Sequence, residues 1–258
     1  MLGWRPARRT KRTMAGAGKG KGRGSGQRRG KAADPGSRRL AEKVKTARGR
    51  PISSTRWLQR QINDPYVARA RAEGYRSRAA YKLIEIDKRF PILKRGGRVV
   101  DLGAAPGGWT QVAVEKVGAR GQVVAVDSAD MEPVEGAEFL ALDFLSPGAD
   151  IKIADALGGP ADVVLSDMAA PSTGVGSVDH LRIMGLCEAA LDFARTVLAA
   201  NGAFVAKVLQ GGGEGELVAA LKRDFRRVKH VKPPASRADS SEMYVVATGY
   251  RGGASDEG

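Results

Sequence analysis

The sequence predicts a doubly wound α/β domain built on a mainly parallel sheet of seven strands, with an antiparallel hairpin at one edge. Short Val-rich runs alternate with helical segments from residue 77 onward, which is typical of a parallel sheet covered by helices on both faces. Four of these runs end at an aspartate, at the carboxyl edge where such sheets bind ligands. The last two runs are separated only by residues 232–241, which are too few for a crossover helix and therefore predict a hairpin.

The expected elements follow one another along the chain. A short helix is expected at about residues 53–62, a turn at 63–65 and an amphipathic helix at 77–90. The seven expected strands are residues 98–102, 122–126, 138–142, 162–166, 203–209, 227–231 and 242–248. Further helices are expected from residue 109 onward and at 151–157, 180–199 and 215–225.

Positive charge is concentrated ahead of the sheet. Residues 1–50 carry a net charge of +15 and residues 51–98 a net +8, whereas residues 99–258 carry a net −8. We expect residues 1–50 to be a disordered basic arm because they hold too little apolar surface to offset the entropy of ordering. Residues 51–250 then form one folded domain and residues 251–258 a flexible tail. The charge distribution predicts a polyanionic partner, above all nucleic acid.

Several classes of protein are disfavoured by the composition. Cys187 is the only cysteine, and with His180 and His230 far apart the sequence offers no metal-binding constellation. No apolar run is long enough to span a membrane, and no signal peptide is evident. We expect a cytoplasmic monomer without bound metal. A mitochondrial transit peptide is the alternative interpretation of the Arg-rich arm, although its Gly-rich stretch lacks an amphipathic period.

The stretch VVDLGAAPGGWTQV, residues 99–112, predicts a ligand site. A strand carrying Asp101 runs into a loop of small residues that lets a ligand approach the backbone closely. The loop reads G-A-A-P-G-G rather than the dinucleotide pattern G-x-G-x-x-G, and Pro106 removes an N–H that a pyrophosphate would need. The loop therefore favours S-adenosylmethionine, which has no phosphate, over NAD.

Charged residues after other strands extend this site. Asp101, Asp127, Asp143 and Asp167 each end an expected strand. One such aspartate is commonplace as a helix N-cap, but four together form an acidic rim suited to ribose hydroxyls, an amine and a sulfonium. Lys207 lies inside the apolar strand AFVAKVL, where a charge is costly without a partner. Asp167 is the expected counter-charge, and a lysine snorkelling from the strand end is the alternative.

The motifs VVDLGAAPGGWTQV, VLSDMA, FVAKVLQG and SRADSSEMYVVATGY, with SRAAYKL upstream, resemble the FtsJ/RrmJ family of ribosomal RNA ribose 2′-O-methyltransferases. The resemblance covers residues 57–250 and implies a Rossmann-like methyltransferase fold. It also implies S-adenosylmethionine as methyl donor and a uridine ribose of large-subunit ribosomal RNA as acceptor. By resemblance, the catalytic tetrad is Lys82, Asp167, Lys207 and Glu242. The implied donor contacts are Gly107, Trp109, Asp127, Asp143 and Asp167.

One departure and several alternatives accompany the resemblance. After Asp167 the family often reads M-A-P-N, whereas this chain has residues 168–171 as M-A-A-P, so the RNA-facing rim lacks the asparagine. Lys207 is expected either to act as general base or to stay charged and stabilise the developing alkoxide. A methyltransferase acting on transfer RNA or an mRNA cap remains an alternative, as does a non-enzymatic RNA-binding ribosome-assembly factor.

Overall fold

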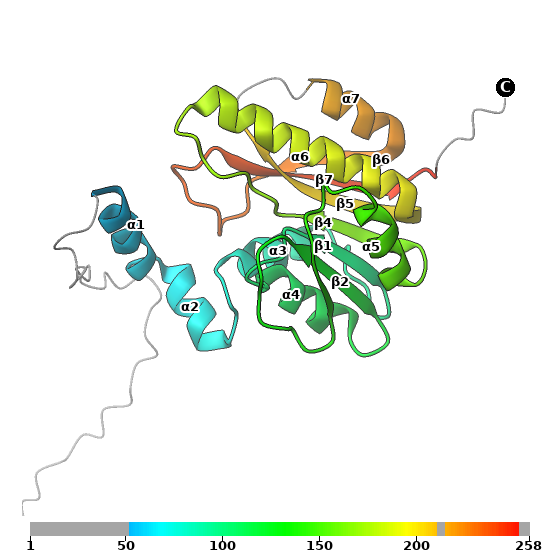
Figure 1. Ribbon diagram of the computed structural model, residues 1–258, viewed down its shortest axis with the longest axis horizontal. Coiled ribbons are helices and arrows are strands. Elements are labelled where there is room, and N and C mark those ends of the chain that lie inside the picture. The colour runs from blue at the N-terminus through cyan, green and yellow to red at the C-terminus, as the bar shows by residue number, and fades with distance from the viewer. Residues whose placement is uncertain (1–51, 211–214, 253–258) are drawn as a thin grey trace, which may run out of the picture. The chain divides into compact units, whose positions relative to one another are not determined.

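A seven-stranded mixed sheet organises the part of the chain that the computed structural model describes, residues 52–210 and 215–252 (Figure 1). The strand order is β3-β2-β1-β4-β5-β7-β6, which confirms the predicted fold class. The strands are β1 (Arg98–Leu102), β2 (Gln122–Asp127), β3 (Glu138–Ala141), β4 (Ala161–Ser166), β5 (Leu198–Leu209), β6 (Phe225–Val231) and β7 (Glu242–Tyr250). The expected arm, residues 1–50, and most of the expected tail lie outside the described residues.

Helices cover both faces of the sheet. They are α1 (Ile52–Ile62), α2 (Pro65–Glu73), α3 (Ala79–Arg89), α4 (Gly108–Val117), α5 (Ala149–Leu157), α6 (Gly176–Val197) and α7 (Gly215–Asp224). Buried side chains of α3 and α4 pack on one face, which we call the α3 face, and those of α5, α6 and α7 pack on the other, the α6 face. None of the described helices is long and apolar enough to cross a membrane.

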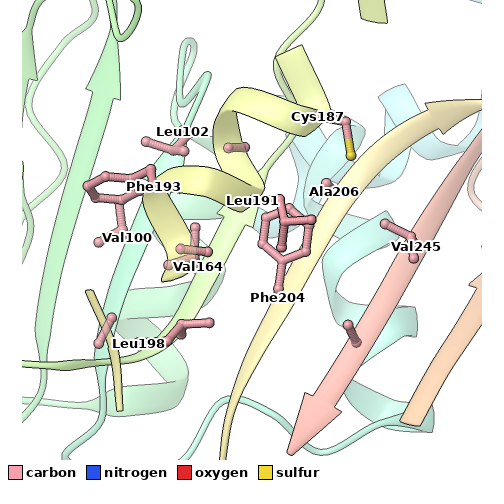
Figure 2. Packing of buried hydrophobic residues seen from close by; sticks show 14 of the residues in the cluster. Val100, Leu102, Val164, Cys187, Leu191, Phe193, Leu198, Phe204, Ala206 and Val245 are labelled. Atoms are coloured by element: carbon pink, nitrogen blue, oxygen red, sulfur yellow. The ribbon is translucent and has the colours of Figure 1, made fainter. Parts of the chain in front are cut away.

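The core on the α6 face shows why the strands read as continuous apolar runs. Figure 2 shows Val100 and Val164 of neighbouring parallel strands beneath Leu191 and Phe193 of α6, with Phe204 of β5 beside them. The opposite side chains of the same strands, such as Val163 and Val205, are equally buried against α3 and α4. Both faces of these strands are therefore apolar, as expected for a parallel sheet covered on both sides.

The antiparallel edge has a register that matters for the site. Strand β7 lies between β5 and β6 and runs antiparallel to both, as the short connection predicts. Tyr244 of β7 is paired with Lys207 of β5 on one side and with Val231 of β6 on the other. Paired residues of antiparallel strands point to the same face, so these three residues share the α3 face.

The structure differs from the expected elements in two places. Residues 65–73 form helix α2, where the sequence was interpreted as a turn at residues 63–65. Asp64 is the N-cap, its carboxylate accepting the Tyr66 amide at 3.0 Å, and Pro65 is the first helical residue. An N-cap aspartate followed by proline starts a helix as readily as a turn. Helix α6 also begins at Gly176, before the expected start, and ends at Val197 because residues 198–202 already belong to β5.

Candidate active site

The Gly-rich loop, residues 103–108, joins β1 to α4, and most of its backbone amides donate hydrogen bonds to other atoms of the protein. The amides of Gly103 and Ala104 both donate to Val126 O, at 2.9 and 3.1 Å, and the Gly107 amide donates to Ala104 O at 2.7 Å. The Ala105 amide donates to Asp127 Oδ2 at 2.9 Å, and proline at 106 has no N–H. These five consecutive loop positions, 103–107, therefore present no free amide to a phosphate, which agrees with the expectation against a dinucleotide.

Gly103 brings this loop against the residue that follows Asp167. A Cβ on Gly103, whose φ is +77°, would lie 2.8 Å from the Cα and the backbone nitrogen of Met168. The Asp167 amide also donates to Leu102 O at 3.1 Å. The ends of β1 and β4 are thus in direct contact, and only glycine permits both this approach and this φ.

Asp127 and Asp143 lie at the carboxyl edge, as expected. Asp127 ends β2, and its Oδ1 accepts the Ala129 amide at 2.8 Å while its Oδ2 holds the Gly-rich loop. Asp143 lies two residues beyond the end of β3, is exposed, and accepts the Leu145 amide at 3.0 Å. Each carboxylate oxygen can accept more than one hydrogen bond, so both residues retain acceptor capacity toward a ligand.

Asp101 does not lie on the acidic rim, contrary to the expectation. Strand β1 continues to Leu102, and the Asp101 side chain is 0% exposed. Its Oδ2 accepts the Thr110 hydroxyl at 2.7 Å, and its Oδ1 has no hydrogen-bond partner among the described residues. Burial, together with the negative charges of Asp167 and Asp127, raises the pKa of Asp101 to about 7, although the Thr110 hydrogen bond opposes the rise.

Asp167 and Lys207 form the first half of the predicted tetrad. Lys207 Nζ lies 2.7 Å from Asp167 Oδ1 and donates to the Asp167 backbone carbonyl at 2.8 Å. Burial alone would raise the pKa of Asp167, but the positive charges of Lys207 and Lys82 outweigh it and hold the pKa below its ordinary value. The carboxylate therefore stays ionised and provides the counter-charge that Lys207 requires.

Lys82 and Glu242 form the second half. Lys82 Nζ is paired with Glu242 Oε1 and donates to the Tyr244 hydroxyl at 3.0 Å. The side chains of the four tetrad residues are between 10% and 19% exposed. The structure thus brings all four predicted residues together, from α3, the end of β4, β5 and the start of β7.

Tyr244 joins the two halves and was missed by the sequence interpretation. Its hydroxyl lies 2.7 Å from Asp167 Oδ1 and 2.8 Å from Glu242 Oε1. Burial and these two carboxylates raise the pKa of Tyr244 well above its ordinary value, so the phenol stays neutral and donates its one proton to one carboxylate at a time. The signal in the sequence was the spacing of Glu242 and Tyr244, because residues i and i+2 of a strand share a face.

Comparison with known proteins shows the family. Residues 75–250 match the profile of the family described as FtsJ-like methyltransferase. The chain belongs to the FtsJ-like methyltransferase family. Proteins named ribosomal RNA large subunit methyltransferase E are 63% identical over 222 residues in Paramagnetospirillum magneticum and 61% identical over 229 residues in Cereibacter sphaeroides. These matches cover 84% and 86% of this chain and 91% and 94% of the relatives.

A solved structure agrees with this assignment. A ribosomal RNA methyltransferase from Plasmodium falciparum is 29% identical and superposes with a TM-score of 0.62, covering 69% of this chain and 100% of the other. This FtsJ-like methyltransferase is therefore an enzyme that uses a methyl donor. Among its described residues, no group of three or more His, Cys, Asp or Glu side chains could hold a metal ion.

Two hollows of the FtsJ-like methyltransferase adjoin the tetrad. The smaller, of about 20 Å³, lies between the Gly-rich loop, Ala79 and Asp167 and has room for about one water-sized group. Trp109 lines it, but its ring is 2% exposed and packs 5.4 Å from the ring of Tyr244, with Nε1 donating to Ala79 O at 2.8 Å. Trp109 therefore braces α4 against α3 and β7.

The larger hollow, of about 360 Å³, is lined by Lys82 and Glu242. Its wall is formed mainly by basic and polar side chains of α1, α3 and the segment before β7: Arg60, Gln61, Arg78, Arg237, Asp239 and Ser240. Arg78 is paired with Asp64 and donates to the Ala235 carbonyl, so it fastens α2 to the segment that leads to Glu242. Asp167 thus borders the small hollow beside the Gly-rich loop, and Lys82 and Glu242 border the wider, basic one.

Proposed function

We propose that this FtsJ-like methyltransferase transfers a methyl group from S-adenosylmethionine to the ribose 2′-hydroxyl of a uridine in large-subunit ribosomal RNA. The observation that carries the proposal is the pairing of Lys207 with Asp167 and of Lys82 with Glu242 around Tyr244, directly beside the Gly-rich loop. The relatives named ribosomal RNA large subunit methyltransferase E support the substrate. We further propose a cytoplasmic monomer that needs no metal.

The residues at the Gly-rich loop fit a cationic donor without phosphate. Positions 103–107 offer no free amide, while Asp127 and Asp143 retain acceptor capacity for hydroxyl or amine groups. Gly107 has a φ of +104°, which favours glycine, and Arg76 and Val134 fill the space that a Cβ would take. When bound, the donor supplies a methyl carbon activated by its sulfonium. We assign the donor contacts to Gly107, Trp109, Asp127, Asp143 and Asp167.

The tetrad then handles the acceptor oxygen. Two acceptors of Asp167 engage Lys207 Nζ, and an ammonium has three N–H donors, so one donor remains for the ribose oxygen. The ionised Asp167 favours the charged lysine, which stabilises negative charge as the hydroxyl loses its proton to water. In this version Lys82 and Glu242 orient the acceptor site, and the Tyr244 hydroxyl holds the two ion pairs in a fixed position relative to each other. The proposal therefore favours charge stabilisation over a neutral Lys207 acting as general base.

The variant Lys207→Arg tests this division of roles. Arg stays protonated at all accessible pH values, so charge stabilisation predicts measurable methyl transfer by Lys207→Arg with little dependence on pH between 7 and 9, and none by Lys207→Ala. Methyl transfer is measured at saturating donor and RNA. If Lys207→Arg is as inactive as Lys207→Ala while both bind donor normally, the general-base version is favoured.

Mapping of 2′-O-methyl groups on total RNA from cells lacking the protein tests the substrate. Loss of one uridine mark in large-subunit ribosomal RNA is the expected result. Loss of a mark on transfer or messenger RNA instead would reassign the substrate. No lost mark, together with a defect in subunit assembly, would favour a non-enzymatic assembly factor.

A further inference from the structure

A second concentration of positive charge lies in the folded domain, far along the chain from the basic arm. Residues 222–232, at the end of α7 and along β6, contain six of the 14 Lys and Arg of residues 99–258 and one of their 22 acids. The remainder of residues 99–258 is strongly acidic. An acidic surface repels nucleic acid, so a compact basic stretch within it is where a polyanion would make contact.

The strand register places two of these cations on one face of the sheet. Val231 is paired with Tyr244, Lys229 with Val246 and Arg227 with Thr248. Because alternate residues share a face, Lys229 and Arg227 lie on the α3 face, the face to which Tyr244 and Lys207 belong. They follow one another away from the tetrad at intervals of roughly 7 Å along β6.

Arg226 lies at an irregularity in the pairing of β6 with β7. The register pairs Phe225 with Tyr250 and Arg227 with Thr248 but skips Arg226 and Gly249. Gly249 has a φ of +75°, and a Cβ on it would lie 3.2 Å from the Cβ and the Cδ of Arg226. Phe225 joins Leu217 and Leu221 of α7 in the core on the α6 face, so the alternation of residues 227–231 ends before it. Arg226 and Lys222 are therefore close in sequence and equal in charge to Arg227 and Lys229 but lie outside this alternating run.

The side chains of Arg227 and Lys229 are exposed to solvent. No ion pair or side-chain hydrogen bond between described residues engages either side chain, whereas Lys232 donates to the carbonyls of Ala238 and Ser240. Charged side chains on an edge strand also discourage pairing with another copy of the chain. That role requires charge on the edge but no preference for the face on which the tetrad lies.

We propose that the α3 face of β6 is an RNA-binding surface, on which Arg227 and Lys229 contact consecutive phosphates of the strand that enters the tetrad. The inference rests on the proposed function, since it takes RNA as the substrate. Arg and Lys bind phosphate without regard to base sequence, so this surface positions the RNA while the acceptor site selects the nucleotide.

Two double variants with the same change in charge test the inference. Arg227→Gln/Lys229→Gln removes the pair on the α3 face, and Lys222→Gln/Arg226→Gln removes one charge from α7 and one from the irregular start of β6. Binding of unmodified large-subunit ribosomal RNA is measured at several salt concentrations, with methyl transfer at saturating donor. Loss of two phosphate contacts makes the slope of log affinity against log salt shallower by about 1.4 to 1.8. The RNA KM rises while kcat stays within about twofold.

The expected result is this change for Arg227→Gln/Lys229→Gln and little change for the control pair. Equal shifts in both variants would show a nonspecific charge effect and overturn the inference. Unchanged RNA binding with dimerisation of Arg227→Gln/Lys229→Gln, measured by sedimentation, would assign the charges to edge protection instead. If the unsubstituted protein itself methylates no RNA, the proposed function fails, which is distinct from failure of this surface.

Discussion

Replacement of Asp101 by asparagine should remove a pH-dependent loss of stability. Asp101 is 0% exposed and its pKa is raised from 3.8 to about 7, chiefly by burial. Between pH 4 and 7 the unfolded chain loses this proton while the native protein keeps it, so the free energy of unfolding falls as pH rises. One pKa unit corresponds to about 1.4 kcal/mol, so the full loss is about 4 kcal/mol and is complete above about pH 7.

Asparagine keeps an acceptor for the Thr110 hydroxyl but cannot ionise. The difference in unfolding free energy between Asp101→Asn and the unsubstituted protein should therefore move in favour of the variant by about 3 kcal/mol between pH 5 and pH 8. Urea unfolding at a series of pH values measures it, and Asp155→Asn, an exposed residue of α5, controls for the loss of one negative charge. A difference that does not vary with pH would refute the argument from burial.

Two further substitutions test the contacts around the tetrad. Tyr244→Phe keeps the ring packing but removes a hydrogen bond to charged groups, worth about 1.5 to 3 kcal/mol, so kcat should fall about 10- to 100-fold with donor affinity unchanged. Tyr250→Phe, which loses a hydrogen bond to Arg195 O at the far end of β7, should leave kcat unchanged, and equal losses in both variants would contradict the positioning role. Gly103→Ala and Gly96→Ala share a φ near +78°, but only the former meets Met168. The free energy of unfolding of Gly103→Ala should therefore be about 1 to 3 kcal/mol lower than that of Gly96→Ala, and Gly103→Ala should lose methyl transfer. Equal stability of the two variants would refute the close approach of Gly103 to Met168.

Much of the fold could be predicted because its signals are local. The alternation of apolar runs with helical segments, and the short connection before the last strand, were enough to predict seven strands and the antiparallel edge. Helix α2 was not predicted because Asp64 and Pro65 fit a turn as well as an N-cap and first helical residue. The boundary between α6 and β5 was also misplaced, because Leu198, expected in the helix, pairs with Ala161 of β4 instead.

The sequence by itself carried the family motifs, the tetrad that their resemblance implies, and the loop that favours a donor without phosphate. The tertiary structure decided what each side chain faces. It buried Asp101 against Thr110 of α4 rather than on the rim, placed Tyr244 between the two ion pairs, and set Arg227 and Lys229 on the α3 face. These outcomes depend on the register of strands distant in sequence, and a shift of one residue would turn every side chain to the opposite face.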